Sequence, residues 1–213
     1  MDSADAAEMV AEVHEAEEET GEASRTRFRN RAALMIAILA AVLAMCGLGG
    51  GNATDDMIYN NIKASDTWAF YQAKNVRQTE YRIAADRLEV ELQDPTISPE
   101  ARKAAETQLA KYRETIARYD DEPDAKAPQD SLRGEGKKQL AAQARSYERV
   151  RDRASDQDNN FDFSETFLQP AIVLGSVAIL SGSRAVLTLS VVLGAVRTLL
   201  MINGYALLFP LPF

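Results

Sequence analysis

Residues 32–51 read AALMIAILAAVLAMCGLGGG, a run of twenty amino acids without a charged side chain. At about 1.5 Å of rise per residue, a helix of this length covers the roughly 30 Å hydrocarbon core of a bilayer. A cleaved signal peptide or a lipoprotein anchored through Cys46 would also contain an apolar run. Against both, 31 residues with nine carboxylates precede it, and the bulky Met45 stands directly before the cysteine. The run therefore predicts a retained transmembrane helix.

Two further apolar runs lie toward the C-terminal end of the chain. Residues 166–183 are uncharged and are interrupted only by Gln169 and Pro170, and residues 186–208 contain Arg197 as their only charged residue. The residues between these runs predict a tight turn, so together they predict a transmembrane hairpin and three spans in total. A hairpin that re-enters the same leaflet is the alternative.

Charge is segregated along the chain, which has 213 residues and a formal net charge of -8. An acidic protein repels a polyanion, so nucleic-acid binding is excluded, and the uncharged runs argue against a soluble enzyme. Residues 1–31 contain too little apolar surface to form a core, and we expect an acidic disordered tail with arginines beside the membrane.

Lysines and arginines close to a span predict its orientation, because they favour the cytoplasmic side. Arg25, Arg27, Arg29 and Arg31 directly precede the first span, and Arg184 lies in the turn of the hairpin. This pattern predicts a multi-pass membrane protein with a cytoplasmic N-terminus and with residues 52–165 on the opposite side.

Residues 52–165 have a helical pattern with prolines only at positions 95, 99, 123 and 128. These breaks predict helices over about 55–93, 99–119 and 134–165, with Ser98 as an N-cap and Pro99 at the first helical position. We therefore expect an all-α protein in which three transmembrane helices carry an elongated extramembrane, antiparallel, coiled-coil-like stalk. Because the second helix is short, the loop 120–133 is expected to run back along the stalk before the third helix begins.

Apolar residues recur at spacings of three and four in these helices, which is typical of a coiled-coil seam. The second helix carries Ala105, Leu109, Tyr112, Ile116 and Tyr119, and the third carries Leu140, Gln143, Tyr147, Val150, Ala154, Gln157 and Phe161. The corresponding set in the first helix is sparser: Ile58, Ile62, Ala69, Val76, Ile83 and Val90. This sparseness predicts a small, partly polar core or contacts from another subunit.

The most distinctive stretch is SDTWAFYQAK at residues 65–74, which contains Trp68, the only tryptophan. Trp68 lies 17 residues beyond the first span, about 25 Å along a continuous helix, which is too far for an anchor at the membrane interface. A packing role fits this distance better. At the same height, counted back from the second span, the third helix contains residues 147–150, so we expect Trp68 to contact them.

With its place shortly after a span and the apolar hairpin that follows, this stretch resembles a family of bacterial membrane proteins catalogued as domain of unknown function 4337. The resemblance covers residues 31–208, and its positions here are Asp66, Trp68, Tyr71, Gln72 and Lys74. It implies an inner-membrane location and makes these five residues candidates for packing or partner contacts. It supplies no activity, cofactor or catalytic residue, and the mid-span Arg197 and the acidic tail depart from it.

No stretch matches a catalytic, cofactor-binding or metal-binding motif. His14 is the only histidine, and the acidic runs at 17–19 and 120–124 lack the spacing of a calcium loop, so we expect them to be solvated. No small-molecule substrate can be identified either.

Arg197 is the sharpest functional candidate, because an arginine at mid-depth costs about 3 kcal/mol on insertion scales and usually faces a bundle interior, water or a partner. We expect a non-enzymatic membrane-anchored scaffold, in contact with the lipid bilayer, that forms homo-oligomers or docks a protein partner. A small transport or channel subunit that uses Arg197 is the alternative.

Overall fold

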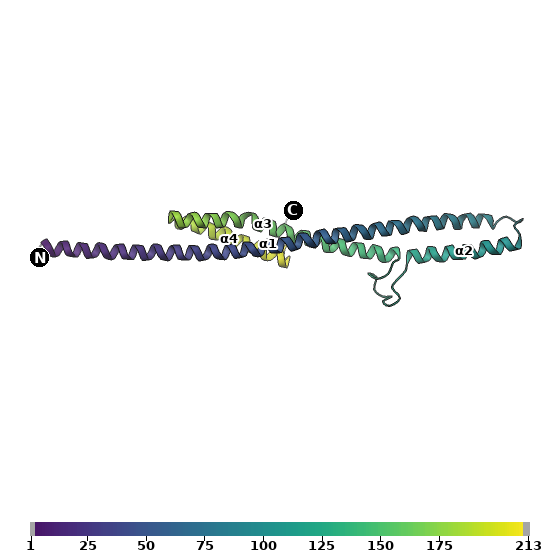
Figure 1. Ribbon diagram of the computed structural model, residues 1–213, viewed down its shortest axis with the longest axis horizontal. Helices are drawn as coiled ribbons and strands as arrows, with labels where there is room; N and C mark the ends of the chain where they lie inside the picture. The colour runs from purple at the N-terminus through teal and green to yellow at the C-terminus, as the bar shows by residue number, and fades with distance from the viewer. Residues whose placement is uncertain (1–2, 211–213) are drawn as a thin grey trace. The chain divides into compact units, whose positions relative to one another are not determined.

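The computed structural model describes residues 3–210, with side chains described from residue 21 onward. The described part contains four helices: α1 (Ser3–Glu91), α2 (Pro99–Asp120), α3 (Lys137–Ser181) and α4 (Arg184–Ala206) (Figure 1). The only β-type pairing within it is one isolated bridge between Pro123 and Gly134. The predicted all-α class is therefore confirmed.

Helices α1, α3 and α4 are long and apolar enough to cross a membrane. They contain the three predicted spans, and the turn expected between the last two is present, with Gly182 at a φ of +65°. Two of the spans continue without a break into helices expected beyond the membrane. α1 joins the first span to the predicted 55–93 helix, and α3 joins the predicted third helix to the second span.

The disordered tail that composition predicts for residues 1–31 is not found, because α1 begins at Ser3. Extending an existing helix requires no new nucleation, and the alanines and glutamates that recur in this segment are good helix formers. The side chains of residues 1–20, including His14 and the acidic run 17–19, lie outside the described ones.

The helices form two compact units. The span unit combines Met1–Thr54 with Ser155–Phe213, and the hairpin unit comprises Asp55–Ala154. Since α1 and α3 each cross the boundary, the span unit is built from two segments that are far apart in the sequence, whereas the hairpin unit is one continuous segment.

The spans of one chain pack closely through small residues. The core of the span unit comprises Leu39, Cys46, Ala53, Phe161, Leu168, Ala171 and Met201. Ser190 Oγ donates a hydrogen bond to the carbonyl oxygen of Ala171 at 2.6 Å. A Cβ atom on Gly194 would lie 2.5 Å from Leu39 Cδ2, so α4 approaches α1 to a distance that suits glycine.

In the hairpin unit, α1 runs antiparallel to α2 and then to α3, which follow one another along it (Figure 1). Arg113 and Glu89 join α2 to α1 through an ion pair of 2.7 Å. The expected return of the loop along the stalk is wrong. The N–H of Glu135 donates to the carbonyl oxygen of Glu122 at 2.9 Å, which closes the loop on itself and lets α3 begin beside the end of α2.

The limits of α2 and two of the three seams agree with the predictions. Ser98 Oγ accepts a hydrogen bond from the N–H of Ala101 at 3.1 Å, and Pro99 is the first residue of α2. All five seam residues of α2 are at least partly buried, and the seam of α3 is correct except at Val150, which is exposed.

The seam predicted for the first helix lies on the wrong face. Its members Ile58, Ile62, Ala69, Val76, Ile83 and Val90 are all exposed. The row that α1 buries or half-buries has the same alternation of three and four but is mostly small or polar: Asn60, Ala64, Thr67, Tyr71, Lys74, Gln78, Tyr81, Ala85 and Leu88. Lys74 and Gln78 of this row donate hydrogen bonds to facing elements, and Asn60 and Thr67 donate to carbonyl oxygens of α1 itself, which makes their burial favourable.

Candidate functional site

The motif at residues 65–74 is divided between two faces of α1. Trp68, Tyr71 and Lys74 follow one another at intervals of three residues and lie on the face that packs against the rest of the hairpin unit. Asp66 and Gln72 are exposed. The structure therefore brings three of the five predicted motif residues together and leaves two at the surface.

Trp68 fixes the register of α1 against α3. Its Nε1–H donates to Glu148 Oε1 at 2.8 Å, and its ring meets that of Tyr71 edge to face, with the centroids 5.5 Å apart. A partly buried indole N–H requires an acceptor, which Glu148 supplies. The predicted contact of Trp68 with residues 147–150 is confirmed.

Lys74 is a buried cation, with only 6% of its side chain exposed. Its Nζ donates to Glu122 Oε2 at 2.9 Å and to the carbonyl oxygen of Glu135. The rings of Phe70 and Tyr119 lie 5.8 and 5.4 Å from the same atom. One ammonium group therefore holds both ends of the loop between α2 and α3 against α1.

Amide side chains of α3 hold the same loop from the other side. Gln139 Oε1 accepts from the N–H of Glu122 at 3.2 Å, and Gln139 Nε2 donates to Asp121 Oδ1 at 2.6 Å. Gln143 Nε2 donates to the carbonyl oxygen of Gly134 at 3.0 Å. We call Lys74, Glu122, Glu135 and Gln139 the Lys74 cluster; it joins α1, α3 and the loop.

Closure of the loop requires glycine at position 134. Gly134 has a φ of +119°, and a Cβ atom there would overlap the carbonyl oxygen of Glu122. Only glycine adopts this conformation without strain. The loop therefore returns to its starting point through a residue that has no side chain.

Two carboxylates beside the cluster are stabilised in their charged form. Hydrogen bonding from the Gln78 side chain, together with the nearby Lys137, lowers the pKa of Asp120. Hydrogen bonding from Gln139 lowers the pKa of Asp121. A carboxyl group with a lowered pKa is a poor proton donor at neutral pH. The arrangement is therefore suited to holding helices together through charge, and poorly suited to proton transfer.

Arg197 lies on α4 in the span unit and is held by an aromatic ring. Its guanidinium carbon is 3.8 Å from the centroid of the Phe167 ring on α3, a cation–π contact. Its carbonyl oxygen accepts from Ser164 Oγ at 2.8 Å. Within the described residues, Arg197 Nε is buried without a hydrogen-bond partner. Lys74 and Arg197 lie in different units and form two separate features.

Sequence reasoning missed the acidic partners of Lys74. The acidic run at 120–124 was expected to be solvated, yet Glu122 binds a buried ammonium group. The available signal was the lysine itself, which falls in a row of three-and-four spacing together with Tyr71 and Gln78. A lysine at a seam position requires a carboxylate partner, and only the closed loop brings one to it.

A family model described as Domain of unknown function (DUF4337) matches residues 28–207, which include the motif, the Lys74 cluster and Arg197. No curated protein matches the chain. No solved structure matches it either.

Proposed function

The chain belongs to the DUF4337 family, a domain of unknown function. We propose that it is a non-enzymatic, membrane-anchored scaffold that self-associates through its hairpin unit. The observation that carries the proposal is the exposed apolar row on α1. The Lys74 cluster supports it, because its charged groups serve to hold helices in place.

The exposed row repeats every seventh residue. Ile62, Ala69, Val76, Ile83 and Val90 recur at this interval, and between 48% and 67% of each of the four larger residues is exposed. A repeat of seven keeps a row on one side of a helix that pairs with a neighbour. A row of large exposed apolar side chains on one side of a helix is a candidate interaction site.

A second copy of the chain fits this row. Two copies that are inserted in one membrane with the same orientation place their α1 helices parallel, so each residue of the row meets its counterpart. In parallel dimers, β-branched residues at position a favour two strands when leucine occupies position d, and the row supplies the first of these two conditions. The positions three residues further on are polar, namely Ser65, Gln72 and Thr79, which makes the pairing weak by itself. Confinement of both copies to the membrane compensates by raising their effective concentration.

Cysteine cross-linking tests the self-association. In a Cys46→Ser background, we expect Val76→Cys and Ile83→Cys to form disulfide-linked dimers under mild oxidation in native membranes, because the paired residues lie within disulfide reach. The matched control is Lys111→Cys, an exposed position on α2. We expect the row positions to give roughly tenfold more dimer than the control on a non-reducing gel. Equal cross-linking at all three positions, or none in the row, would contradict the proposal.

The proposed location is the inner membrane, with a cytoplasmic N-terminus and a periplasmic hairpin unit. The four arginines before the first span and Arg184 in the turn support this orientation. In the same Cys46→Ser background, we expect a membrane-impermeant maleimide to label Thr107→Cys in intact cells. Ser24→Cys should react only after lysis. Both positions are exposed, so the opposite labelling pattern would show that the orientation is wrong.

The alternative transport role of Arg197 has no comparable support. Its guanidinium group is stacked on Phe167, within the same chain. Such a contact is typical of a packed side chain.

A further inference from the structure

Five arginines gather at the end of the span unit where α3 turns into α4. Arg184 is the first residue of α4, and the other four precede the first span at every second position: Arg25, Arg27, Arg29 and Arg31. On a helix, residues four apart share a face whereas residues two apart do not. The spacing therefore creates two arginine pairs on different sides of α1.

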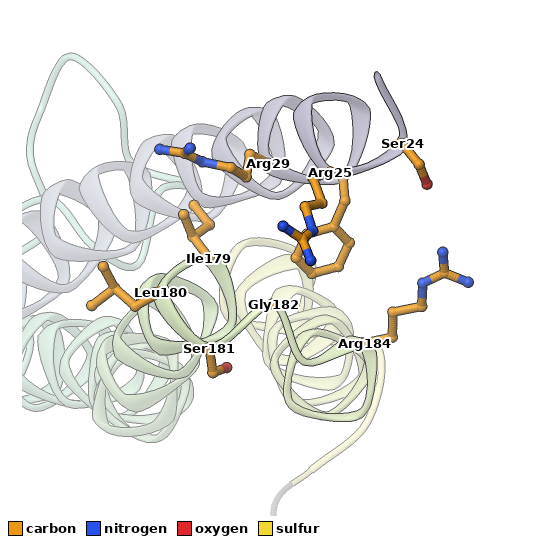
Figure 2. A pocket seen from close by; sticks show the side chains of 9 residues that line it. Ser24, Arg25, Arg29, Ile179, Leu180, Ser181, Gly182 and Arg184 are labelled. Atoms are coloured by element: carbon orange, nitrogen blue, oxygen red, sulfur yellow. The ribbon is translucent and has the colours of Figure 1, made fainter. Parts of the chain in front are cut away.

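Each pair lines its own cavity. Arg25 and Arg29 line a cavity of about 450 Å³ together with Leu180 and Arg184. Figure 2 shows Arg25 reaching from α1 toward the turn at Gly182.

The second cavity, of about 550 Å³, lies beside the other pair. It is lined by Arg27 and Arg31, together with Leu187 and Arg184. Arg184 and Phe28 line both cavities, so the first residue of α4 is shared between them.

Among the residues whose side chains are described, no carboxylate pairs with the arginines of these cavities. Neither cavity has a carboxylate in its lining. None of the five arginines forms an ion pair within the residues whose side chains are described. Arg184 also stands at the N-terminus of α4, where the positive end of the helix dipole disfavours a cation. A bound anion would relieve both sources of repulsion.

The cavities are apolar as well as cationic. Phe28, Leu180 and Leu187 contribute apolar surface, and Leu180 is 87% exposed. The uncharged run of α1 begins at residue 32, and the turn between α3 and α4 joins two spans, so the arginines lie where spans meet the headgroup layer. A free phosphate ion would use only the arginines, whereas a phospholipid would use both kinds of surface.

We propose that these two cavities bind anionic phospholipids, with the lipid phosphate between Arg184 and one arginine pair of α1 and the acyl chains along Leu180 and Leu187. Guanidinium groups suit this role because they bind phosphate oxygens in a bidentate manner. Basic pockets between spans are places where such headgroups bind. The inference goes beyond the proposed scaffold role and does not depend on self-association.

Native mass spectrometry of the purified full chain in detergent tests the proposal, with phosphatidylglycerol and phosphatidylcholine as probes. We expect phosphatidylglycerol to bind roughly tenfold more tightly than phosphatidylcholine. Arg184→Gln should weaken phosphatidylglycerol binding about tenfold, because this residue serves both cavities. Arg25→Gln with Arg29→Gln should remove one bound lipid and leave the other.

The matched control is Arg145→Gln with Arg149→Gln, which removes two exposed arginines from the hairpin unit. We expect this control to bind phosphatidylglycerol like the unmodified chain. Circular dichroism is used to check that each variant remains helical. Equal binding of the two lipids, or an equal loss in the control, would overturn the proposal. Displacement of phosphatidylglycerol by glycerol 3-phosphate at the same concentration would also overturn it, because the site would then recognise a free phosphate.

Discussion

Lys74→Met is expected to release the loop between α2 and α3 and to destabilise the hairpin unit by roughly 2–3 kcal/mol. The substitution removes the ammonium group and leaves the Glu122 carboxylate without its partner. The loss is below the 3–5 kcal/mol typical of a fully buried pair, because about a third of the Glu122 side chain is exposed and regains water. Hydrogen exchange of the full chain measures the effect. The amide of Glu135 should exchange roughly 30- to 150-fold faster, which is the same free energy expressed as a rate ratio.

The matched control is Lys138→Met, which removes a lysine that binds the same segment from the surface. Lys138 lies 3.2 Å from Asp121, and 71% of its side chain is exposed. Water screens such a pair, so we expect the Glu135 amide to exchange within about twofold of its original rate. A second variant combines Lys74→Met with Glu122→Gln and should recover part of the protection, because no unpaired carboxylate remains. Equal effects of Lys74→Met and Lys138→Met would contradict the role given to the cluster.

Phe161→Ala is expected to cost about 3–5 kcal/mol in the span unit, which is the usual range for a buried phenylalanine. Phe161 is 2% exposed, and the ring of Tyr205 meets it at a centroid distance of 4.8 Å. A Cβ atom on Gly49 or Gly204 would lie 2.6 or 2.8 Å from the Phe161 ring. The ring thus fills the space that two glycines leave, and its loss creates a cavity where α1, α3 and α4 meet. Unfolding of the full chain in detergent, followed by circular dichroism, measures the cost.

The control for this substitution is Val173→Ala, which shortens an apolar side chain on the same helix. Val173 is 61% exposed, so we expect its loss to change the free energy of unfolding by about 0.5 kcal/mol or less. Gly204→Val approaches the same contact from the other side and should cost about 1–3 kcal/mol by overpacking. If Phe161→Ala costs no more than Val173→Ala, the packing of Phe161 against Gly49 and Gly204 does not stabilise the span unit.

The contact of Trp68 and the ion pair of Lys74 differ in how far the sequence could predict them. The contact between Trp68 and residues 147–150 follows from helix rise alone, because the two segments lie at the same distance from the ends of the first and second spans. The ion pair between Lys74 and Glu122 does not follow from helix rise. It depends on a loop that closes on itself through Gly134, whereas the sequence predicts a loop that runs back along the stalk.

The tertiary structure also decides which residues of the motif at 65–74 are exposed. Asp66 and Gln72 alternate with Trp68, Tyr71 and Lys74 within ten residues, and the sequence alone does not show which of them meet other helices. Burial of Trp68 and Lys74 is favourable because Glu148 and Glu122 accept their hydrogen bonds. Asp66 and Gln72 remain available to a partner.

The sequence by itself determined the helical class, the three candidate spans and the limits of α2. These features follow from local causes, namely uncharged runs long enough to cross a bilayer and prolines that interrupt helices. Only the tertiary structure decided which face of α1 is buried. Two rows of α1 have a repeat that suits a seam, one apolar and one small or polar. The second is buried because Lys74 and Gln78 find hydrogen-bond partners 38 to 61 residues away along the chain, which no local pattern contains.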